Sequence, residues 1–315
     1  MSAPVVHRLD PTPGNVVEVF SRDLDPVLTV DPGDTVVVRS LDASGYLRPP
    51  RVPGEKPPTM FAPRRGHCLT GPIAVRGAEP GTVLAVRYAS LVPDDWGWTA
   101  AGGMDNALNR RLGVAPGQAA WLLWDLDVAA GTATNDRGFS RSLAPFLGVT
   151  GVASAEPGEH VTTPPRAAGG GNIDCRELTA GSTLYLPVLV PGALLSVGDG
   201  HAAQGDGEVG GTAVECPMTT ELVLDLVTDP PVPTIHAVTP TARITFGFDA
   251  DLNAATGDAL DAMLTWMQAL YGVERGTALA LASSAVDLRV TQVANGVWGV
   301  HAVLAHGVLS PAADR

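Results

Sequence analysis

Lysine is almost absent from this chain. Of the 20 basic residues among its 315, nineteen are arginine, and the only lysine is Lys56, in the proline-rich segment RPPRVPGEKPP. A catalytic lysine needs a desolvated pocket that lowers its pKa, and a proline-rich loop is a poor place for one. The sequence therefore argues against a lysine-dependent catalytic site.

Cysteine and positive charge are also scarce. The three cysteines, Cys68, Cys175 and Cys216, are far apart and odd in number, so they predict neither a disulfide framework nor a thiolate zinc site. We expect buried, unreactive thiols. The net charge of −13 argues against nucleic acid or an anionic membrane as a partner, because phosphate groups are bound by basic patches.

Long apolar runs are missing as well. No stretch of about 18 consecutive apolar residues is present, so no membrane span is expected. The segment MSAPVVHRLDPTPGNVVEVF lacks a basic region followed by an apolar one, which is the pattern of a secretory signal. We therefore expect a cytoplasmic protein.

The first 250 residues contain many short apolar segments separated by glycine and proline. In LTVDPGDTVVVRS, Val36 and Val38 share one face of an extended segment that follows a turn at residues 31–34, and a similar unit turns at 79–81. Further strand candidates are residues 118–130, 148–154, 183–197 and 221–228. This pattern predicts a mainly β fold, with a β-sandwich-like body over residues 1–250.

The pattern becomes helical in residues 251–315. In TGDALDAMLTWMQALYG, apolar residues recur at helical spacing and Gly272 is a C-cap candidate, so this stripe is expected to belong to the core. A second helix over residues 275–286 and a β-hairpin around Asn295-Gly296 should follow. We expect a small α/β element packed on the body, either as a separate part or within one continuous domain.

The segment from Gly169 to Glu215 is the most informative part of the chain. It reads GGGNIDCRELTAGSTLYLPVLVPGALLSVGDGHAAQGDGEVGGTAVE. Asp199 and His201 are two residues apart, as are Asp206 and Glu208, and residues at this spacing on extended backbone project from the same face. Because these pairs follow a long apolar run, they should converge at the rim of a buried sheet and bind a cation; the alternative is a hairpin whose polar groups meet water.

Two residues outside these pairs have similar surroundings. His67 lies at the entry to an apolar segment, where a structural role competes with a ligand or acid–base role. Asp174 follows three glycines and could be a turn residue, a ligand or a substrate-binding carboxylate. The loops 43–66 and 155–172 are expected to border the site, and the other histidines (His7, His160, His236, His301 and His306) to be structural or on the surface.

Three blocks of the chain resemble the acetamidase/formamidase family. They are GHCLTGPIAVRGAEPGT, the segment from Gly169 to Glu215, and SSAVDLRVTQVANGVWGVHAVL, and the resemblance runs from about residue 25 to 305. It implies a mainly β, sandwich-like fold and hydrolysis of the C–N bond of small linear amides to a carboxylate and ammonia. It also implies a homo-oligomer and a metal associated with the site.

The chain departs from the family pattern at two positions. The family commonly has Glu-Thr-Leu-Asp-Ala where this chain has Arg39-Ser40-Leu41-Asp42-Ala43, and an aspartate where it has Thr82. Asp42 is kept, but a carboxylate is lost at Arg39. If either acid shapes the pocket, the preferred amide differs from formamide or acetamide.

A divalent cation accounts best for the chemistry that an amide requires. It activates water and polarises the carbonyl, and a carboxylate carries the proton to the leaving nitrogen. We assign His201, Asp174 and Glu208 as principal ligands, His67 and Asp199 as further candidates, and Glu215 or Asp206 as the proton carrier; His67 is also a catalytic candidate. Zn²⁺ is favoured, although Ca²⁺ and Mn²⁺ suit the same residues. The candidates for substrate binding are Gln204, Asp42 and Asn172.

Other mechanisms fit the sequence less well. The Glu-Lys-Cys and Ser-Ser-Lys amidase sites both need a well-placed lysine. A cysteine nucleophile would be Cys175 or Cys68, but each adjoins its polar neighbour in sequence, and adjacent residues of a strand point to opposite faces. A non-catalytic metal- or ligand-binding protein, or a relative with altered hydrolase specificity, remains the alternative function.

Overall fold

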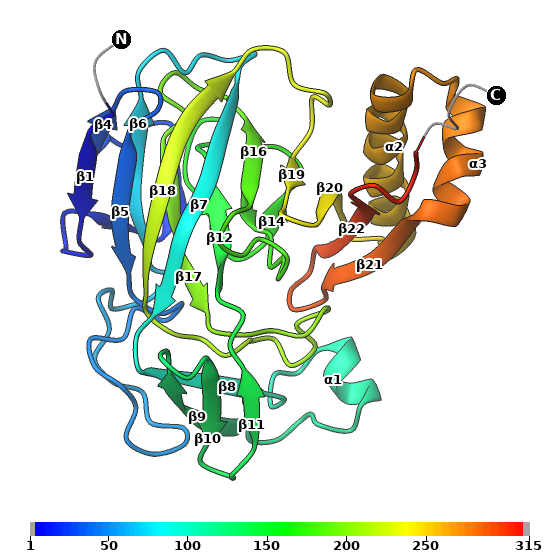
Figure 1. The fold of residues 1–315 in the computed structure, drawn as a ribbon. Helices are drawn as coiled ribbons and strands as arrows, with labels where there is room; N and C mark the ends of the chain where they lie inside the picture. Colours follow the sequence, from blue (N-terminus) through cyan, green and yellow to red (C-terminus); the bar gives the residue numbers. More distant parts are fainter. Residues whose placement is uncertain (1–3, 311–315) are drawn as a thin grey trace.

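The larger of two main sheets crosses the whole molecule. The computed structural model describes residues 4–310, and its nine-stranded sheet has the order β1-β5-β18-β7-β16-β19-β20-β22-β21 (Figure 1). In that order the strands are Val6–Leu9, Thr35–Ser40, Met218–Val227, Val83–Pro93, Thr183–Pro187, His236–Val238, Ala242–Asp249, Trp298–Ala305 and Val286–Gln292.

A seven-stranded sheet packs against this one. Its order is β14-β15-β12-β17-β6-β2, with β4 paired to β6. The strands are Pro165–Arg166, Gly170–Asn172, Phe146–Gly151, Leu195–His201, Leu69–Val75, Val16–Val17 and, for β4, Leu28–Val30. One apolar cluster joins the sheets, with Val36 and Leu222 from the first and Ile73 and Leu195 from the second all fully buried. The predicted mainly β, sandwich-like body is confirmed.

A small sheet and a short helix lie at one end of the sandwich (Figure 1). A four-stranded sheet consists of β8 (Trp96–Ala101), β9 (Ala120–Asp127), β10 (Thr132–Asn135) and β11 (Ser140–Ser142), and the short helix α1 (Ala107–Arg111) lies beside it. A two-stranded ladder joins β3 (Val19–Phe20) to β13 (His160–Val161).

The C-terminal residues form the expected two helices and hairpin. Helix α2 (Leu252–Tyr271) ends at Gly272, whose φ of 64° is the left-handed C-cap, and α3 (Arg275–Ala285) follows. Gly247 on β20 lets α2 pack closely, because a Cβ there would lie 1.9 Å from the Ala255 carbonyl oxygen. In Figure 1 the helices cover the end of the large sheet that β20, β22 and β21 build.

The hairpin differs from the expected two-residue turn. Strands β21 and β22 are separated by five residues, 293–297, and neither Asn295 nor Gly296 has the positive φ that a type I′ turn needs. Instead the Asn295 side chain accepts a hydrogen bond from the Val297 amide at 2.9 Å. Side-chain capping therefore replaces the tight turn.

Other local predictions are confirmed. Val36 and Val38 are both buried on one face of β5, and the turn at 31–34 is closed by the Asp34 amide, which donates to the Asp31 carbonyl at 3.1 Å. All three cysteines are buried and free. Within residues 4–310, no helix has the length and apolarity that crossing a membrane demands.

Candidate active site

A pocket of about 370 Å³ opens between the two loops that were expected to border a site. Its lining includes Arg64 and Arg65 from segment 43–66, His67 just after it, and Thr163 and Asn172 from segment 155–172. The second segment is not a loop throughout, because it forms the short strands β13, β14 and β15. Trp98, Met104 and Asn295 line other parts of the wall, and three carboxylates (Asp199, Glu208 and Glu215) lie in it. The pocket therefore combines acidic groups with basic groups near its mouth.

Strand β17 supplies the centre of the site. Asp199 and His201 project from the same side of it, as predicted, and are both buried. His201 Nε2 lies 3.3 Å from Asp199 Oδ1 and 3.3 Å from Glu215 Oε1. His67 approaches from the opposite side, with Nδ1 3.9 Å from Asp199 Oδ2. Asp199 thus lies between two imidazole rings.

A second set of carboxylates converges on the same histidine. Ligand atoms of Asp174, His201 and Glu208 all lie within 4.8 Å of one another, as do those of Asp199, His201 and Glu215. Gly148 of β12 makes room for them, because a Cβ there would lie 2.5 Å from Asp199 Oδ2 and 2.8 Å from Asp174 Oδ1. His201 is therefore shared by two potential ligand groups.

The backbone is strained where these acids lie. Asp174, Asp199 and Glu208 have φ values of 56°, 58° and 43°, in the left-handed region that residues other than glycine rarely adopt. Such a conformation costs on the order of 1 kcal/mol or more at each position and tends to occur at functional sites. Three strained acidic residues at one place support a functional role for the cluster.

Burial and mutual repulsion set the charges of the carboxyl groups. Burial is the main cause that raises the pKa of Asp174 and Glu208 well above their ordinary values, and neighbouring carboxylates add to it. The same causes raise the pKa of Glu215 to about 7. Asp199 differs: burial acts upward, but the charges of His67 and His201 outweigh it and hold the pKa of Asp199 below its usual range.

The two histidines respond in opposite directions. Burial lowers the pKa of His67, with Asp199 opposing the shift. For His201 burial also acts downward, but Glu215 and Asp199 together raise its pKa well above the ordinary value. The protein thus places one strongly basic imidazole among four acids.

The residues of this cluster fit a divalent cation. Among residues 4–310, several of its buried polar atoms have no hydrogen-bond partner: His67 Nδ1, both oxygens of Asp174, His201 Nε2 and Glu215 Oε2. The contacts of His201 Nε2 at 3.3 Å therefore lack hydrogen-bond geometry. Buried polar atoms are rarely left unpaired, and carboxylate oxygens with an imidazole nitrogen are the ligands of Zn²⁺, Mn²⁺ and related cations.

Gln204 orients this site without lining the pocket. His201 Nδ1 and Gln204 Oε1 are 2.9 Å apart, and Gln204 Nε2 donates to the Asp174 carbonyl at 2.7 Å. An amide oxygen can only accept, so His201 Nδ1 carries a proton, and Nε2 is the nitrogen that faces the carboxylates. The sequence predicts Gln204 as a substrate-binding residue, but in the structure it positions His201 and Asp174.

Asp206 lies apart from the cluster. Its carboxylate pairs with Arg176 at 3.0 Å and faces a different, open groove. Residues 205–208 form a turn, with Gly207 at a φ of 96°, so the expected extended geometry fails here and Asp206 and Glu208 diverge. The structure thus brings six of the predicted residues together (His67, Asp174, Asp199, His201, Glu208 and Glu215) and excludes Asp206.

Two other predicted substrate-binding residues have different surroundings. Asn172 lines the pocket; its Nδ2 donates to the Thr163 carbonyl at 2.7 Å, and its Oδ1 has no partner in the described part of the chain. Asp42 is fully buried behind the wall, where it accepts the Trp98 indole N–H at 2.9 Å and the Tyr46 amide at 2.7 Å. Asp42 therefore holds the wall in place.

Neither departure from the family pattern lines the pocket. Arg39 pairs with Asp94 at 2.6 Å on the surface, and the Thr82 hydroxyl donates to the Glu79 carbonyl within a turn. Arg64, Trp98 and Gly148 also belong to the site, and the sequence patterns do not predict them. The Arg64-Arg65 pair was a visible signal, whereas nothing local marks Trp98 or Gly148.

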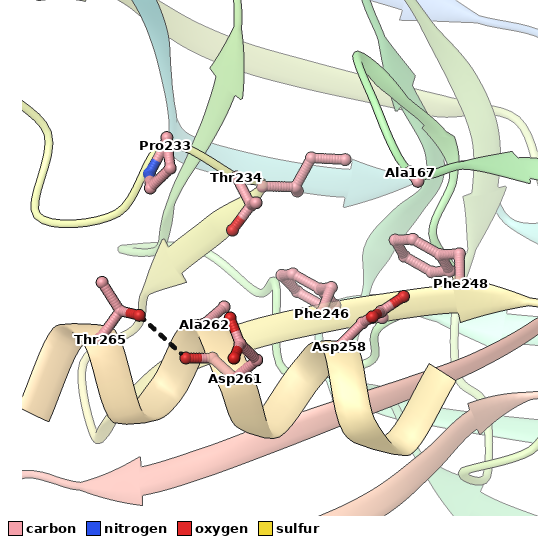
Figure 2. Close-up of a pocket in the computed structure, with 11 residues that line it drawn as sticks. Ala167, Pro233, Thr234, Phe246, Phe248, Asp258, Asp261, Ala262 and Thr265 are labelled. Carbon is pink, nitrogen blue, oxygen red and sulfur yellow. Dashed lines mark hydrogen bonds between the residues drawn. The ribbon is translucent and has the colours of Figure 1, made fainter. Parts of the chain in front are cut away.

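A second hollow of about 240 Å³ lies between β20 and α2. Figure 2 shows Pro233 and Thr234 on one side of it and Asp261 and Thr265 of the helix on the other, with Phe246, Phe248 and Asp258 beside the helix. Asp261 is paired with Arg275, and no histidine or cysteine lines this hollow. It lacks the groups that amide hydrolysis needs, so the acidic pocket is the candidate active site.

Comparisons with known proteins agree with this geometry. The model of the Acetamidase/Formamidase family matches residues 10–157 and 153–300. The solved structure of an acetamidase from Bacillus halodurans superposes with a TM-score of 0.84 at 27% identity, covering 95% of this chain and 97% of that one.

Two curated enzymes are also similar. An acetamidase from Mycolicibacterium smegmatis is 30% identical over 199 residues, which are 45% of this chain and 49% of that protein. A formamidase from Methylophilus methylotrophus is 26% identical over 249 residues, 62% of this chain and 60% of that protein. The fold, the pocket and these similarities lead to one conclusion: the chain belongs to the acetamidase/formamidase family and is an amide hydrolase.

Proposed function

We propose that this hydrolase cleaves small linear amides, of the formamide or acetamide type, and requires a divalent cation held by Asp174, His201 and Glu208. The observation that supports this most strongly is the set of buried, unpaired ligand atoms around His201. When bound, such a cation supplies Lewis acidity toward the amide carbonyl and acidifies water. Zn²⁺ is the favoured ion, because one imidazole with carboxylates suits it.

Glu215 is the proposed proton carrier. Its Oε1 is held by the Ala213 amide at 2.9 Å, while Oε2 has no partner in the described residues and the side chain lines the pocket. A pKa of about 7 lets this carboxyl accept a proton and then return it near neutral pH. Asp206, paired with Arg176 outside the pocket, is a poorer candidate.

The remaining polar groups bind and orient the amide. Asn172 Oδ1 is an unpaired buried acceptor suited to the amide N–H of the substrate, and the Trp98 ring, 5% exposed, forms an apolar part of the wall. Asp199, between His67 and His201, places a negative charge beside both rings. Homo-oligomeric assembly and a cytoplasmic location stay predictions.

The test measures ammonia release from formamide, acetamide and propionamide together with metal content. We expect chelation followed by dialysis to remove stoichiometric metal and to abolish turnover, and one of Zn²⁺, Mn²⁺ or Ca²⁺ to restore it. Full turnover by protein without stoichiometric metal would contradict the cation requirement. Turnover of none of the amides would contradict the proposed substrate class.

A further inference from the structure

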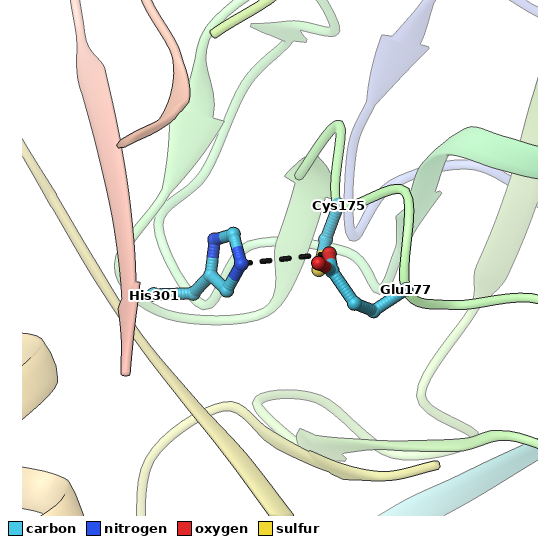
Figure 3. A group of neighbouring side chains, drawn as sticks. All are labelled: Cys175, Glu177 and His301. Atoms are coloured by element: carbon cyan, nitrogen blue, oxygen red, sulfur yellow. Dashed lines mark hydrogen bonds and ion pairs between the residues drawn. The ribbon is translucent and has the colours of Figure 1, made fainter. Parts of the chain in front are cut away.

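Cys175, Glu177 and His301 form a second cluster of ligand groups (Figure 3). Cys175 Sγ lies 3.3 Å from Glu177 Oε2, and His301 Nε2 lies 3.4 Å from the same oxygen. The acidic pocket begins at the preceding residue, Asp174, whose left-handed backbone turns the two neighbouring side chains toward different clusters. The two clusters share no ligand residue.

The imidazole of His301 is aimed into this cluster. It comes from β22 in the C-terminal hairpin and is fully buried. Its Nδ1 lies 2.8 Å from the hydroxyl of Thr291 on β21, while Nε2 has no hydrogen-bond partner within residues 4–310. If Nδ1–H donates to that hydroxyl, the Nε2 lone pair faces Cys175 and Glu177, which is how metal-binding histidines are usually oriented.

The cluster has a route to solvent through Glu177. Cys175 and His301 are buried, but the Glu177 side chain is 17% exposed. Arg289 donates to Glu177 Oε1 at 2.7 Å from the outer side, which leaves Oε2 directed at the thiol and the imidazole. The ion pair with Arg289 therefore orients the carboxylate without occupying the oxygen that faces the cluster.

The identities of the three groups select the kind of cation. The acidic pocket offers mainly carboxylate oxygens, whereas this cluster combines sulfur, nitrogen and oxygen. Thiolate and imidazole favour Zn²⁺ and similar borderline ions over Ca²⁺ and Mg²⁺. Three protein ligands would leave one position of a tetrahedral site for water.

We propose that Cys175, Glu177 and His301 bind a second divalent cation of the Zn²⁺ class. On binding, the Cys175 S–H bond breaks, the proton goes to solvent, and the sulfur, Glu177 Oε2 and His301 Nε2 each donate an electron pair to the cation. No electron is transferred. The bound ion links the segment after Asp174 to the C-terminal hairpin, so its effect is on stability and on the position of that segment.

Binding of Co²⁺ gives a spectroscopic signal that distinguishes this cluster from the acidic pocket. A thiolate bound to Co²⁺ gives a near-ultraviolet charge-transfer band, and the pocket's proposed ligands include no sulfur. We expect this band in the full-length protein loaded with Co²⁺, its loss in Cys175→Ala, and its retention in Cys68→Ala, which removes another buried cysteine. His301→Gln and Glu177→Gln should each weaken Co²⁺ binding by at least about tenfold.

Thermal unfolding of His201→Ala separates this site from the proposed function. That variant loses the pocket's shared histidine but should keep the cobalt band. Zn²⁺ at about 100 times its dissociation constant should raise its Tm by roughly 5 °C, and Cys175→Ala in the same background should abolish the rise.

Three results would overturn the proposal: no charge-transfer band in protein that binds Co²⁺, a band that survives Cys175→Ala, or binding unaffected by both His301→Gln and Glu177→Gln. If Cys175→Ala does not fold, the two polar variants still decide the question.

Discussion

His201 and His236 are both fully buried, and their surroundings differ in charge. Carboxylates lie 3.3 Å from His201 on two sides. His236 stacks on Tyr185 with ring centres 4.6 Å apart, meets the edge of Trp266, and donates from Nδ1 to the Thr234 carbonyl at 2.8 Å. Burial therefore encloses one ring with acids and the other with aromatic groups.

The two rings titrate in opposite directions as a result. Burial lowers the pKa of His236 to about 4, with only the bond to Thr234 opposing it, whereas Glu215 and Asp199 outweigh burial and raise the pKa of His201. Both rings leave Nε2 without a partner among the described residues. An unpaired buried nitrogen thus indicates a site only where other ligand groups converge on it.

The largest effect should follow from removing the charge that faces His201. Asp199→Asn keeps the size of the side chain but loses the carboxylate between His67 and His201. We expect turnover of the best small amide to fall about 1,000-fold, because replacing a carboxylate beside a functional imidazole with its amide has an effect of at least this order. Steady-state ammonia release measures this, and far-UV circular dichroism checks the fold. Turnover within tenfold of the parent would contradict a role for Asp199 in the reaction.

A smaller loss should follow from displacing the acids without altering them. In Gly148→Ala, the new methyl group would overlap Asp199, His201 and Asp174, each less than 3 Å from its position. We expect about a 100-fold loss of kcat, because a misplacement of about 1 Å has that effect. The matched control is Gly117→Ala, which has nothing within 4 Å of the added carbon. Equal activity of the two variants would contradict the crowding argument.

The aromatic surroundings of His236 predict a pH-dependent stability. Because its folded pKa of about 4 lies below the ordinary 6.5, the unfolded chain binds more protons between these values, so stability is lost as the pH falls from 6.5 to 4. The loss is roughly 3 kcal/mol. His236→Phe keeps a ring against Tyr185 and should reduce the slope of the unfolding free energy over this range.

Urea unfolding at several pH values from 7 to 4 provides this measurement. The difference between parent and variant isolates His236, since the other titrating groups are common to both. Parallel curves would mean that the ring is not neutral in the folded protein. His201→Phe should not reduce this slope of the unfolding free energy in the same way, because the pKa of His201 in the folded protein is raised and not lowered.

The smallest effect is expected at Asp206. Its carboxylate is 27% exposed and pairs with Arg176, and such surface pairs contribute about 1 kcal/mol or less. Asp206→Asn should change kcat/KM less than about twofold, in contrast to Asp199→Asn. A hundredfold loss of kcat/KM would instead indicate that Asp206 carries the proton.

The sequence predicts the site well where its polar residues lie on a strand. Asp199 and His201 are expected on one face because they are two apart, and both lie on β17 with their side chains 3.3 Å apart, although the backbone at Asp199 is left-handed instead of extended. The same rule is wrong for Asp206 and Glu208, since a turn replaces the strand there. Likewise, the β-rich body and the C-terminal helices follow from periodicity and from glycine and proline positions.

Long-range packing accounts for what the sequence does not predict. Asp174 reaches the cluster through a left-handed backbone, which no pattern of residues around it predicts. Gly148 and Trp98 enter the site from strands far away along the chain, and His301 meets Cys175 only because β22 pairs beside β20. No spacing rule relates such positions, so only the assembled sheets bring them together.

The loop that carries Glu208 is held by strand β21 and the residue after it. The Gly207 amide donates to the Thr291 carbonyl at 2.9 Å, and the Val293 amide donates to the Gly207 carbonyl at 2.8 Å. A chain cut before β21 would keep every carboxylate of the pocket but lack the partner that fixes one of them. The position of Glu208 therefore depends on the hairpin of β21 and β22, so a change in that hairpin should disturb the pocket without altering any residue that lines it.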